Sequence, residues 1–238
     1  EFVQKICKAR IIRLKQAASY IKNLDTTLDE DFLDKNEKIL EDNDIKGLIS
    51  NYDKLEKPAK LLKLISMVKE LKKQNKKVLI WSTHLKTIDL ILENLRLENV
   101  VVKKIIGETN RDFEIKKNIM EEFNDNNSDL DALVALPQAC SESISLHKAC
   151  QNAIYYDLNY NAAEFLQSLD RIHRVGGSEI HPVYYNFLHY EKTVDTKIFE
   201  RVFLKADRQM QIIEEDNLTF DLNEEEENWE HLYNDLNL

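Results

Sequence analysis

The feature that most constrains the fold is a repeated alternation, from residue 77 onward, between short apolar runs and segments with helical periodicity. The apolar runs are predicted strands, at 78–81, 100–106, 132–136, 153–156 and 183–188. The helical segments between and after them lie at 85–94, 113–123, 162–173 and 194–214. Strands that are mainly apolar and separated by helices predict an α/β fold, with a mainly parallel central sheet and helices on both faces.

The residues before this alternation predict helices and a polar connector. An apolar periodicity over 2–24 indicates a first helix, whereas residues 25–53 are rich in Asp, Asn and Glu. Pro58 can occupy the first turn of a helix that runs to about residue 73. We therefore expect three parts: a helical lead-in with a connector at 1–57, the α/β domain at 58–215 and an acidic tail at 216–238.

Charge and hydropathy exclude some classes of function. The formal net charge of −10 argues against a nonspecific coat on nucleic acid, although the first fifteen residues carry five lysines and arginines against one glutamate. No run of 18 apolar residues occurs, so no membrane partner is expected. Three cysteines without metal-type spacing predict reduced thiols in a cytoplasmic protein. The chain begins at Glu1 without a Met, which predicts a piece of a longer protein.

The chain contains only four glycines, at 47, 107, 176 and 177. Neither a GxxxxGK[ST] loop nor a GxGxxG loop can be written from them. Such loops need glycine because a bound phosphate approaches the backbone closely. The usual cradle for the phosphates of a nucleotide is therefore absent from this sequence.

A polar stripe is predicted on the helix at 162–173. Gln167, Arg171 and Arg174 are spaced by four and three residues, which places them on one helical face. Arginine presents a rigid fork of donors that keeps its charge, so two arginines and an amide suit a chain of phosphates. They could stabilise the charge that develops on a transferred phosphoryl group. The alternative is an exposed helix whose arginines simply face water.

Polar residues also follow the predicted strands, at the edge where parallel α/β sheets bind ligands. Ser82 and Thr83 come directly after the strand at 78–81, and Asp157 follows the strand at 153–156. The two hydroxyls could hold an anion, but plain capping of the next helix is the favoured interpretation on this segment alone.

Two further segments offer hydroxyls after strands. Thr109 follows a glycine turn that could hold a nucleic-acid phosphate, although turns of this composition are common. Ser141 and Ser143 lie among small residues after the strand at 132–136. The small residues would let a phosphate come close, but a tight connection without any ligand is equally compatible with the spacing. No cluster of residues predicts a metal site.

Five segments, in this order, resemble the motifs of the C-terminal lobe of superfamily-two helicases, in particular the Swi/Snf-type DNA-dependent ATPases. The segments are 77–91, 107–124, 137–146, 153–161 and 167–174, which are similar to motif IV, the "GST…FN" stretch, motif V, the strand and turn after it, and motif VI. Asp170, in place of the glycine or histidine of other branches, favours the Swi/Snf type. Each motif is loose, but the ordered set is specific and covers about residues 9–205.

The resemblance implies a RecA-like three-layer lobe with helical N- and C-terminal extensions. It implies ATP and Mg²⁺ as cofactors, both held mainly by an N-terminal RecA-like lobe outside this chain. Arg171 and Arg174 would be arginine fingers oriented by Gln167, and this chain alone would be inactive. The residues that would contact phosphates of double-stranded DNA, independently of base sequence, are Ser82, Thr83, Thr109, Ser141 and Ser143. A cytoplasmic, nucleoid-associated protein is expected.

The sequence departs from the family pattern in motif V and just after motif VI. Cys140, Ser141 and Ser143 replace glycines, Ser145 replaces an asparagine, and Gly177 replaces a glutamine. These changes resemble bacterial relatives associated with defence or restriction. Two alternatives to a double-stranded DNA translocase stay open: a strand-separating helicase, and a degenerate lobe that serves as a protein-binding scaffold. Retention of both arginines and the glutamine of motif VI favours a motor.

Overall fold

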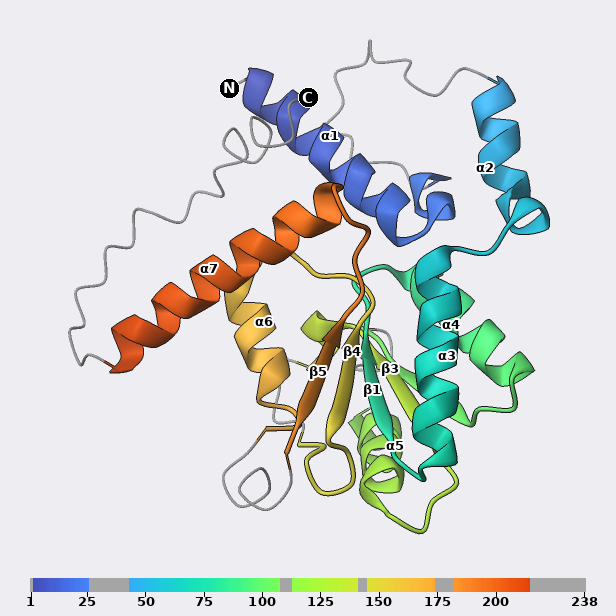
Figure 1. The fold of residues 1–238 in the computed structure, drawn as a ribbon, viewed down its shortest axis with the longest axis vertical. Coiled ribbons are helices and arrows are strands. Elements are labelled where there is room, and N and C mark those ends of the chain that lie inside the picture. The colour runs from blue at the N-terminus through green and yellow to red at the C-terminus, as the bar shows by residue number, and fades with distance from the viewer. Residues whose placement is uncertain (1, 26–42, 108–112, 141–144, 174–181, 215–238) are drawn as a thin grey trace. The chain divides into compact units, whose positions relative to one another are not determined.

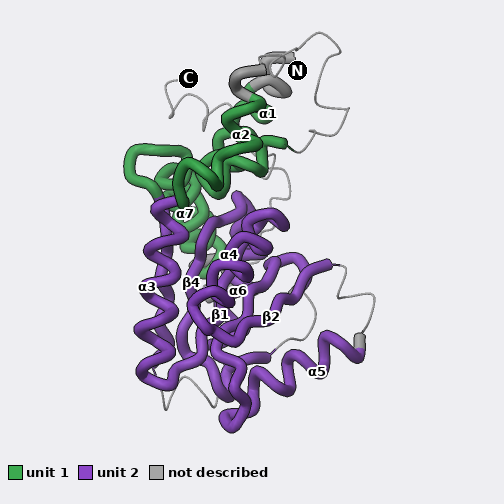
Figure 2. The backbone as a smooth tube through the Cα atoms, turned by 90° about the vertical axis from the view of Figure 1, so that its right-hand side faces the viewer, with its two compact units in different colours: residues 1–57, 190–238 green, residues 58–189 purple. Residues whose placement is uncertain are grey.

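The computed structural model describes residues 2–25, 43–107, 113–140, 145–173 and 182–214. The chain divides into two compact units, one of residues 58–189 and one that combines residues 1–57 with residues 190–238 (Figure 2). Within the described residues, no helix combines the length and the apolar character that crossing a membrane requires.

The unit of residues 58–189 is built on a five-stranded sheet in which every pair of neighbouring strands is parallel (Figure 1). The strands are β1 (Val78–Trp81), β2 (Val102–Ile105), β3 (Ala132–Ala135), β4 (Asn152–Tyr155) and β5 (Tyr184–Phe187), in the spatial order β2-β3-β1-β4-β5. All five predicted strands and the predicted parallel sheet are confirmed. Because the strands start and end in register, their carboxyl ends lie along one edge, called here the carboxyl edge.

Helices cover both faces of this sheet. They are α3 (Ala59–Lys73), α4 (Leu85–Leu97), α5 (Phe113–Asn124) and α6 (Ala162–Leu169). On one face, apolar side chains of α3 and α4, such as Leu64 and Ile91, form a core with Ile80 and Ile154. On the other face, Phe165 of α6 lies edge-on to Tyr155 of β4. Every residue of the three inner strands β1, β3 and β4 is buried, as expected for a sheet covered on both sides.

The second unit is helical. It contains α1 (Phe2–Ser19), the 3-10 helix η1 (Ile21–Asp25), α2 (Asn43–Leu55) and α7 (Val194–Glu214). The Tyr20 hydroxyl donates to Asp53 at 2.5 Å, and Lys22 pairs with the same carboxylate, so η1 and α2 are joined. Helix α7 contacts α1. It therefore groups with the N-terminal helices, whereas the predicted domain at 58–215 includes it with the sheet.

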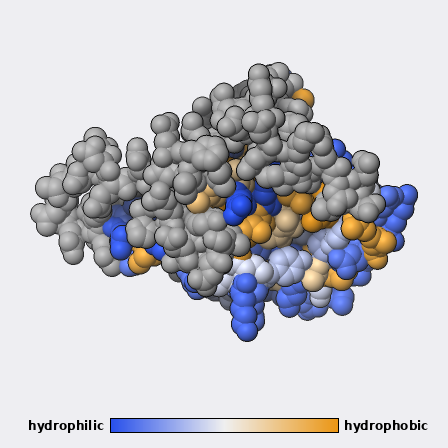
Figure 3. All heavy atoms as spheres, turned by 90° about the horizontal axis from the view of Figure 1, so that it is seen from above, coloured by the Kyte–Doolittle hydropathy of each residue, from blue (hydrophilic) through white to orange (hydrophobic). Residues whose placement is uncertain are grey.

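Both charged and apolar side chains reach the surface. In Figure 3, hydrophobic atoms in orange and hydrophilic atoms in blue lie side by side on the described part of the face shown. Leu97 at the end of α4 and Leu62 on α3 are among the exposed apolar residues. A mixed surface of this kind is ordinary for a folded protein, because there is too little polar surface to cover a compact chain.

The predicted helix at 162–173 is wrong at its C-terminal end, because α6 ends at Leu169. The Tyr185 hydroxyl of β5 donates to the Leu169 carbonyl at 2.9 Å. The Leu146 amide donates to the Arg171 carbonyl at 2.8 Å. The Leu169 carbonyl also accepts from the amides of Ile172 at 3.4 Å and His173 at 3.2 Å, so the chain makes one further, tightened turn after α6.

Candidate functional site at the carboxyl edge of the sheet

A buried carboxylate joins two neighbouring strands at the carboxyl edge. Asp157 follows β4, and its side chain is 2% exposed. It accepts a hydrogen bond from the Ser82 hydroxyl at 3.0 Å, and bonds from the Thr83 amide and the Thr83 hydroxyl at 2.6 Å each. Both residues come from the turn between β1 and α4. Asp157 therefore sets the position of this turn.

The two hydroxyls predicted to contact DNA are thus already used inside the protein. Ser82 is 0% exposed, and its hydroxyl donates to Asp157. Thr83 is partly buried, and its hydroxyl also lies 3.0 Å from Nδ1 of His84. The Nδ1 atom of His84 is 3.7 Å from the Asp157 carboxylate. A DNA contact by Ser82 would require this buried hydrogen bond to break, whereas Thr83 lies closer to the surface.

Beyond Asp157, the chain passes through a short turn into α6. Asn161 caps the helix, because its side-chain oxygen accepts from the amides of Ala163 at 3.0 Å and Glu164 at 3.2 Å. In return, Glu164 accepts from the side-chain amides of Asn161 at 3.3 Å and Asn159 at 3.2 Å. This reciprocal arrangement satisfies the amides that a helix N-terminus leaves unpaired. The start of α6 is therefore held firmly.

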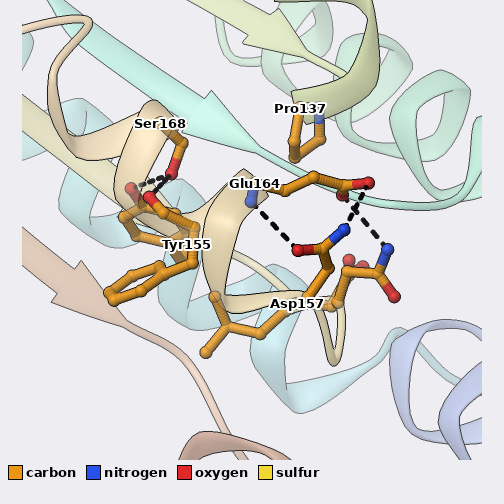
Figure 4. A pocket seen from close by; sticks show the side chains of 9 residues that line it. Pro137, Tyr155, Asp157, Glu164 and Ser168 are labelled. Carbon is orange, nitrogen blue, oxygen red and sulfur yellow. Dashed lines mark hydrogen bonds between the residues drawn. The ribbon is translucent and has the colours of Figure 1, made fainter. Parts of the chain in front are cut away.

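A small pocket lies between this turn, α6 and the start of the 3-10 helix η4 (Pro137–Cys140) that follows β3 (Figure 4). Its lining combines apolar and polar side chains: Pro137, Tyr155, Asp157, Leu158, Asn159, Asn161, Glu164, Phe165 and Ser168. At its wall, the Tyr155 hydroxyl and the Ser168 hydroxyl are 2.6 Å apart, and Ser168 donates to the Phe165 carbonyl. Burial raises the pKa of Tyr155 well above its usual range, so this phenol stays neutral at physiological pH.

The predicted stripe of motif VI is only partly brought together. Gln167 is exposed on α6, whereas Arg171 lies past the end of the helix and is 8% exposed. Gln167 lies within α6 and Arg171 lies in the turn that follows it, so a shared face for Gln167, Arg171 and Arg174 stays a prediction. Arg174 lies outside the described residues. The backbone bond from Leu146 fixes Arg171 next to the segment that precedes β4.

The remaining predicted DNA contacts, Thr109, Ser141 and Ser143, also lie outside the described residues. The described residues on either side of Ser141 and Ser143 are hydrogen-bonded to α5. Lys116 donates to the Ala139 carbonyl at 2.7 Å, and Asn124 donates to the Ser145 carbonyl at 2.8 Å. No signal in the sequence singles out Lys116, because a buried lysine and an exposed one look alike on an amphipathic helix.

Within the described residues, no group of three or more His, Cys, Asp or Glu side chains gathers in a way that could hold a metal ion. The polar groups at the carboxyl edge are hydroxyls and amides, which can donate to an anion, and the carboxylates of Asp157 and Glu164, which only accept and already hold donors.

A parallel sheet covered by helices, with its polar turns at the carboxyl edge, is the architecture of a RecA-like lobe, and the comparisons agree. The family model of the helicase conserved C-terminal domain matches residues 56–176, which is just over half of the chain. The chain therefore belongs to the helicase conserved C-terminal domain family. The crystal structure of the C-terminal part of the Fun30 ATPase domain matches with a TM-score of 0.56 and 22% identity, over 67% of this chain and 51% of that one. The predicted RecA-like fold is confirmed.

Curated relatives are Snf2-type proteins, which confirms the predicted branch. The Lymphoid-specific helicase of Homo sapiens is 30% identical over 155 residues, which are 65% of this chain and 18% of that protein. Protein CHROMATIN REMODELING 5 of Arabidopsis thaliana is 28% identical over 159 residues, or 65% of this chain and 9% of that protein. This chain thus spans less than a fifth of either relative's length. The predicted bacterial origin stays a prediction.

Proposed function

We propose that this chain is the second motor lobe of an ATP-dependent translocase of double-stranded DNA. The observation that carries the proposal is the match of residues 56–176 to the helicase C-terminal family in a chain that keeps Gln167, Arg171 and Arg174. ATP and Mg²⁺ would be held mainly by an N-terminal RecA-like lobe. Arg171 and Arg174 would stabilise the charge on the transferred phosphoryl group, with Gln167 orienting them.

The same proposal gives the carboxyl edge a role in holding DNA. Thr83, Thr109, Ser141 and Ser143 would donate hydrogen bonds to backbone phosphates. The buried Ser82 would help to hold the turn through its hydrogen bond to Asp157. Such contacts position a duplex without reading its bases. They would be sensitive to salt and weak for this lobe alone. The lobe alone would not hydrolyse ATP, because the other lobe would supply the phosphate cradle, Mg²⁺ and the water-activating carboxylate.

The test is ATP hydrolysis by the full-length protein with and without duplex DNA, comparing wild type with Arg174→Ala. We expect turnover that depends on DNA and that falls by about 10³-fold or more in the mutant, the usual contribution of an arginine finger. Arg96→Ala is the matched control, because Arg96 is an exposed arginine in the last turn of α4. Wild-type turnover in Arg174→Ala would remove the finger assignment.

Two other outcomes decide between the alternatives. Strand displacement from a forked duplex, coupled to ATP hydrolysis, would replace translocation by strand separation. Absence of turnover in the wild type, with or without DNA, would favour a scaffold. That alternative has its own supporting observation, since Cys140, Ser141 and Ser143 stand where family members have glycine.

A further inference from the structure

We propose that Asp157 is a positioning residue through which DNA binding stimulates ATP turnover, by exchange of the Thr83 hydroxyl between Asp157 and a DNA phosphate. The inference rests on the proposed function and deepens it. No step of it requires Asp157 to touch either DNA or ATP.

The exchange follows from the hydrogen-bonding capacity of Thr83. Its hydroxyl has one proton, and that proton is donated to Asp157 at 2.6 Å. A phosphate only accepts hydrogen bonds, so the hydroxyl must leave the carboxylate in order to hold DNA. The Thr83 amide and the Ser82 hydroxyl still bind Asp157 after that change. The turn therefore has two arrangements that differ in the partners of the Thr83 hydroxyl, which in this structure are Asp157 and Nδ1 of His84.

Few residues separate Asp157 from α6, so a movement of the turn that holds Thr83 can affect this helix. Asp157 and Asn161 are separated by three residues, and Asn161 caps the helix that carries Gln167. The intervening turn is fixed by Asn159, which accepts from the Tyr160 amide at 3.0 Å and donates to Glu164 at 3.2 Å. A rigid turn transmits a displacement instead of absorbing it. A change at Thr83 would thus alter the placement of Gln167.

A matched carboxylate exists at the opposite edge of the sheet. Asp131 precedes β3 and accepts from the Val101 amide at 2.8 Å and from Lys72 at 2.7 Å. Like Asp157 it joins neighbouring segments through a backbone amide, but no hydroxyl predicted to bind DNA is among these two donors. Asp131→Asn therefore controls for the general effect of neutralising a structural carboxylate.

The experiment measures ATP turnover of the full-length protein without DNA and at saturating duplex DNA. In Asp157→Asn, the ratio of the two rates should fall about fivefold or more, which is the low end of coupling between two sites. Thr83→Val keeps the shape of the side chain and removes the hydroxyl, and it should lower the same ratio. If the two residues act as one device, the double mutant should lose no more than the larger single loss. Asp131→Asn should keep the wild-type ratio.

The outcomes separate this inference from the proposed function. Absence of DNA-dependent turnover in the wild type overturns both. Wild-type stimulation that persists in Asp157→Asn, or an equal fall in Asp131→Asn, overturns the inference and leaves the motor intact. If Asp157→Asn does not fold, as judged by circular dichroism, Thr83→Val decides alone: a normal ratio in that folded variant contradicts the exchange.

Discussion

Each edge of the sheet has an aspartate that accepts hydrogen bonds from neighbouring segments, but the two aspartates differ in their burial and in their donors. At the amino edge, Asp131 pairs with Lys72 and holds the Val101 amide, in a place where its side chain is 19% exposed. At the carboxyl edge, Asp157 is 2% exposed and holds two hydroxyls and an amide. When an exposed lysine–carboxylate pair is lost, water solvates the group left behind, so the loss of stability is small. Water cannot readily reach the hydroxyls that donate to the buried Asp157. We therefore expect substitutions at the carboxyl edge to cost more stability than substitutions at the amino edge.

The largest expected effect tests this contrast directly. Asp157→Ala should lower the free energy of unfolding by about 2–3 kcal/mol, because buried donors lose their acceptor. Asp131→Ala should cost about 1 kcal/mol, because water can reach the groups left behind. Urea unfolding followed by the fluorescence of buried Trp81, in a Trp229→Phe background, measures both. Equal losses would break the comparison.

Removing one donor from each aspartate should have a smaller effect on stability, and it tests the same comparison between the two edges. Ser82→Ala removes a fully buried hydroxyl and should cost about 1 kcal/mol. Lys72→Met removes the cation that pairs with Asp131, and it should cost less than half of that, because the Lys72 side chain is 39% exposed. The same unfolding assay applies. A larger loss for Lys72→Met than for Ser82→Ala would show that the amino edge is the more tightly specified one.

The smallest effect concerns pH at the amino edge. Burial raises the pKa of the Cys150 thiol to about 12, from a value of 9.0 in an unfolded chain. The unfolded thiol ionises first, so its contribution is fully present below about pH 9 and is lost as pH rises toward 12. The loss at pH 9 is about 0.4 kcal/mol. In Cys150→Ala, stability should fall less between pH 8 and 9.5 than in wild type.

Burial near the same site has the opposite effect on a neighbouring cation. It lowers the pKa of Lys77, whose ammonium donates to the carbonyls of Phe123 at 2.9 Å and Asp125 at 2.6 Å. Lys77 therefore adds stability as pH rises from its lowered pKa toward the ordinary value of 10.5. Cys150 and Lys77 also act on each other's pKa, so the difference between wild type and Cys150→Ala reports the thiol together with its effect on Lys77. Parallel stability curves for the two proteins would contradict a strongly raised thiol pKa.

Strand positions were predictable because they depend on local patterns. Runs such as 78–81 and 132–136 are apolar throughout, and a strand buried on both faces needs that composition. The start of α3 after Pro58 was predictable for a similar reason, since proline suits the first turn of a helix. The end of α6 was not predictable, because the residues around it make tertiary hydrogen bonds: the Leu169 carbonyl accepts from the Tyr185 hydroxyl, sixteen positions away, and the Arg171 carbonyl accepts from the Leu146 amide.

The candidate site divides in the same way. The ordered motifs and the residues Gln167, Arg171 and Arg174 can be read from the sequence alone, because side-chain chemistry is written there. The sequence also places Asp157 after a strand, at the edge where ligands bind. It does not say that Asp157 would hold Ser82 and Thr83, because a partner 74 or 75 positions away leaves no local signal.

The sequence by itself thus determined the class of fold, the family and the chemical character of the candidate residues, since all three depend on composition, periodicity and motif order. Only the tertiary structure decided which groups are already paired. It buried Arg171 beyond the end of α6, and it bound the hydroxyls of Ser82 and Thr83 to Asp157. The physical reason is that hydrogen bonds and burial depend on which strands become neighbours, and the order β3-β1-β4 brings together segments that are distant along the chain.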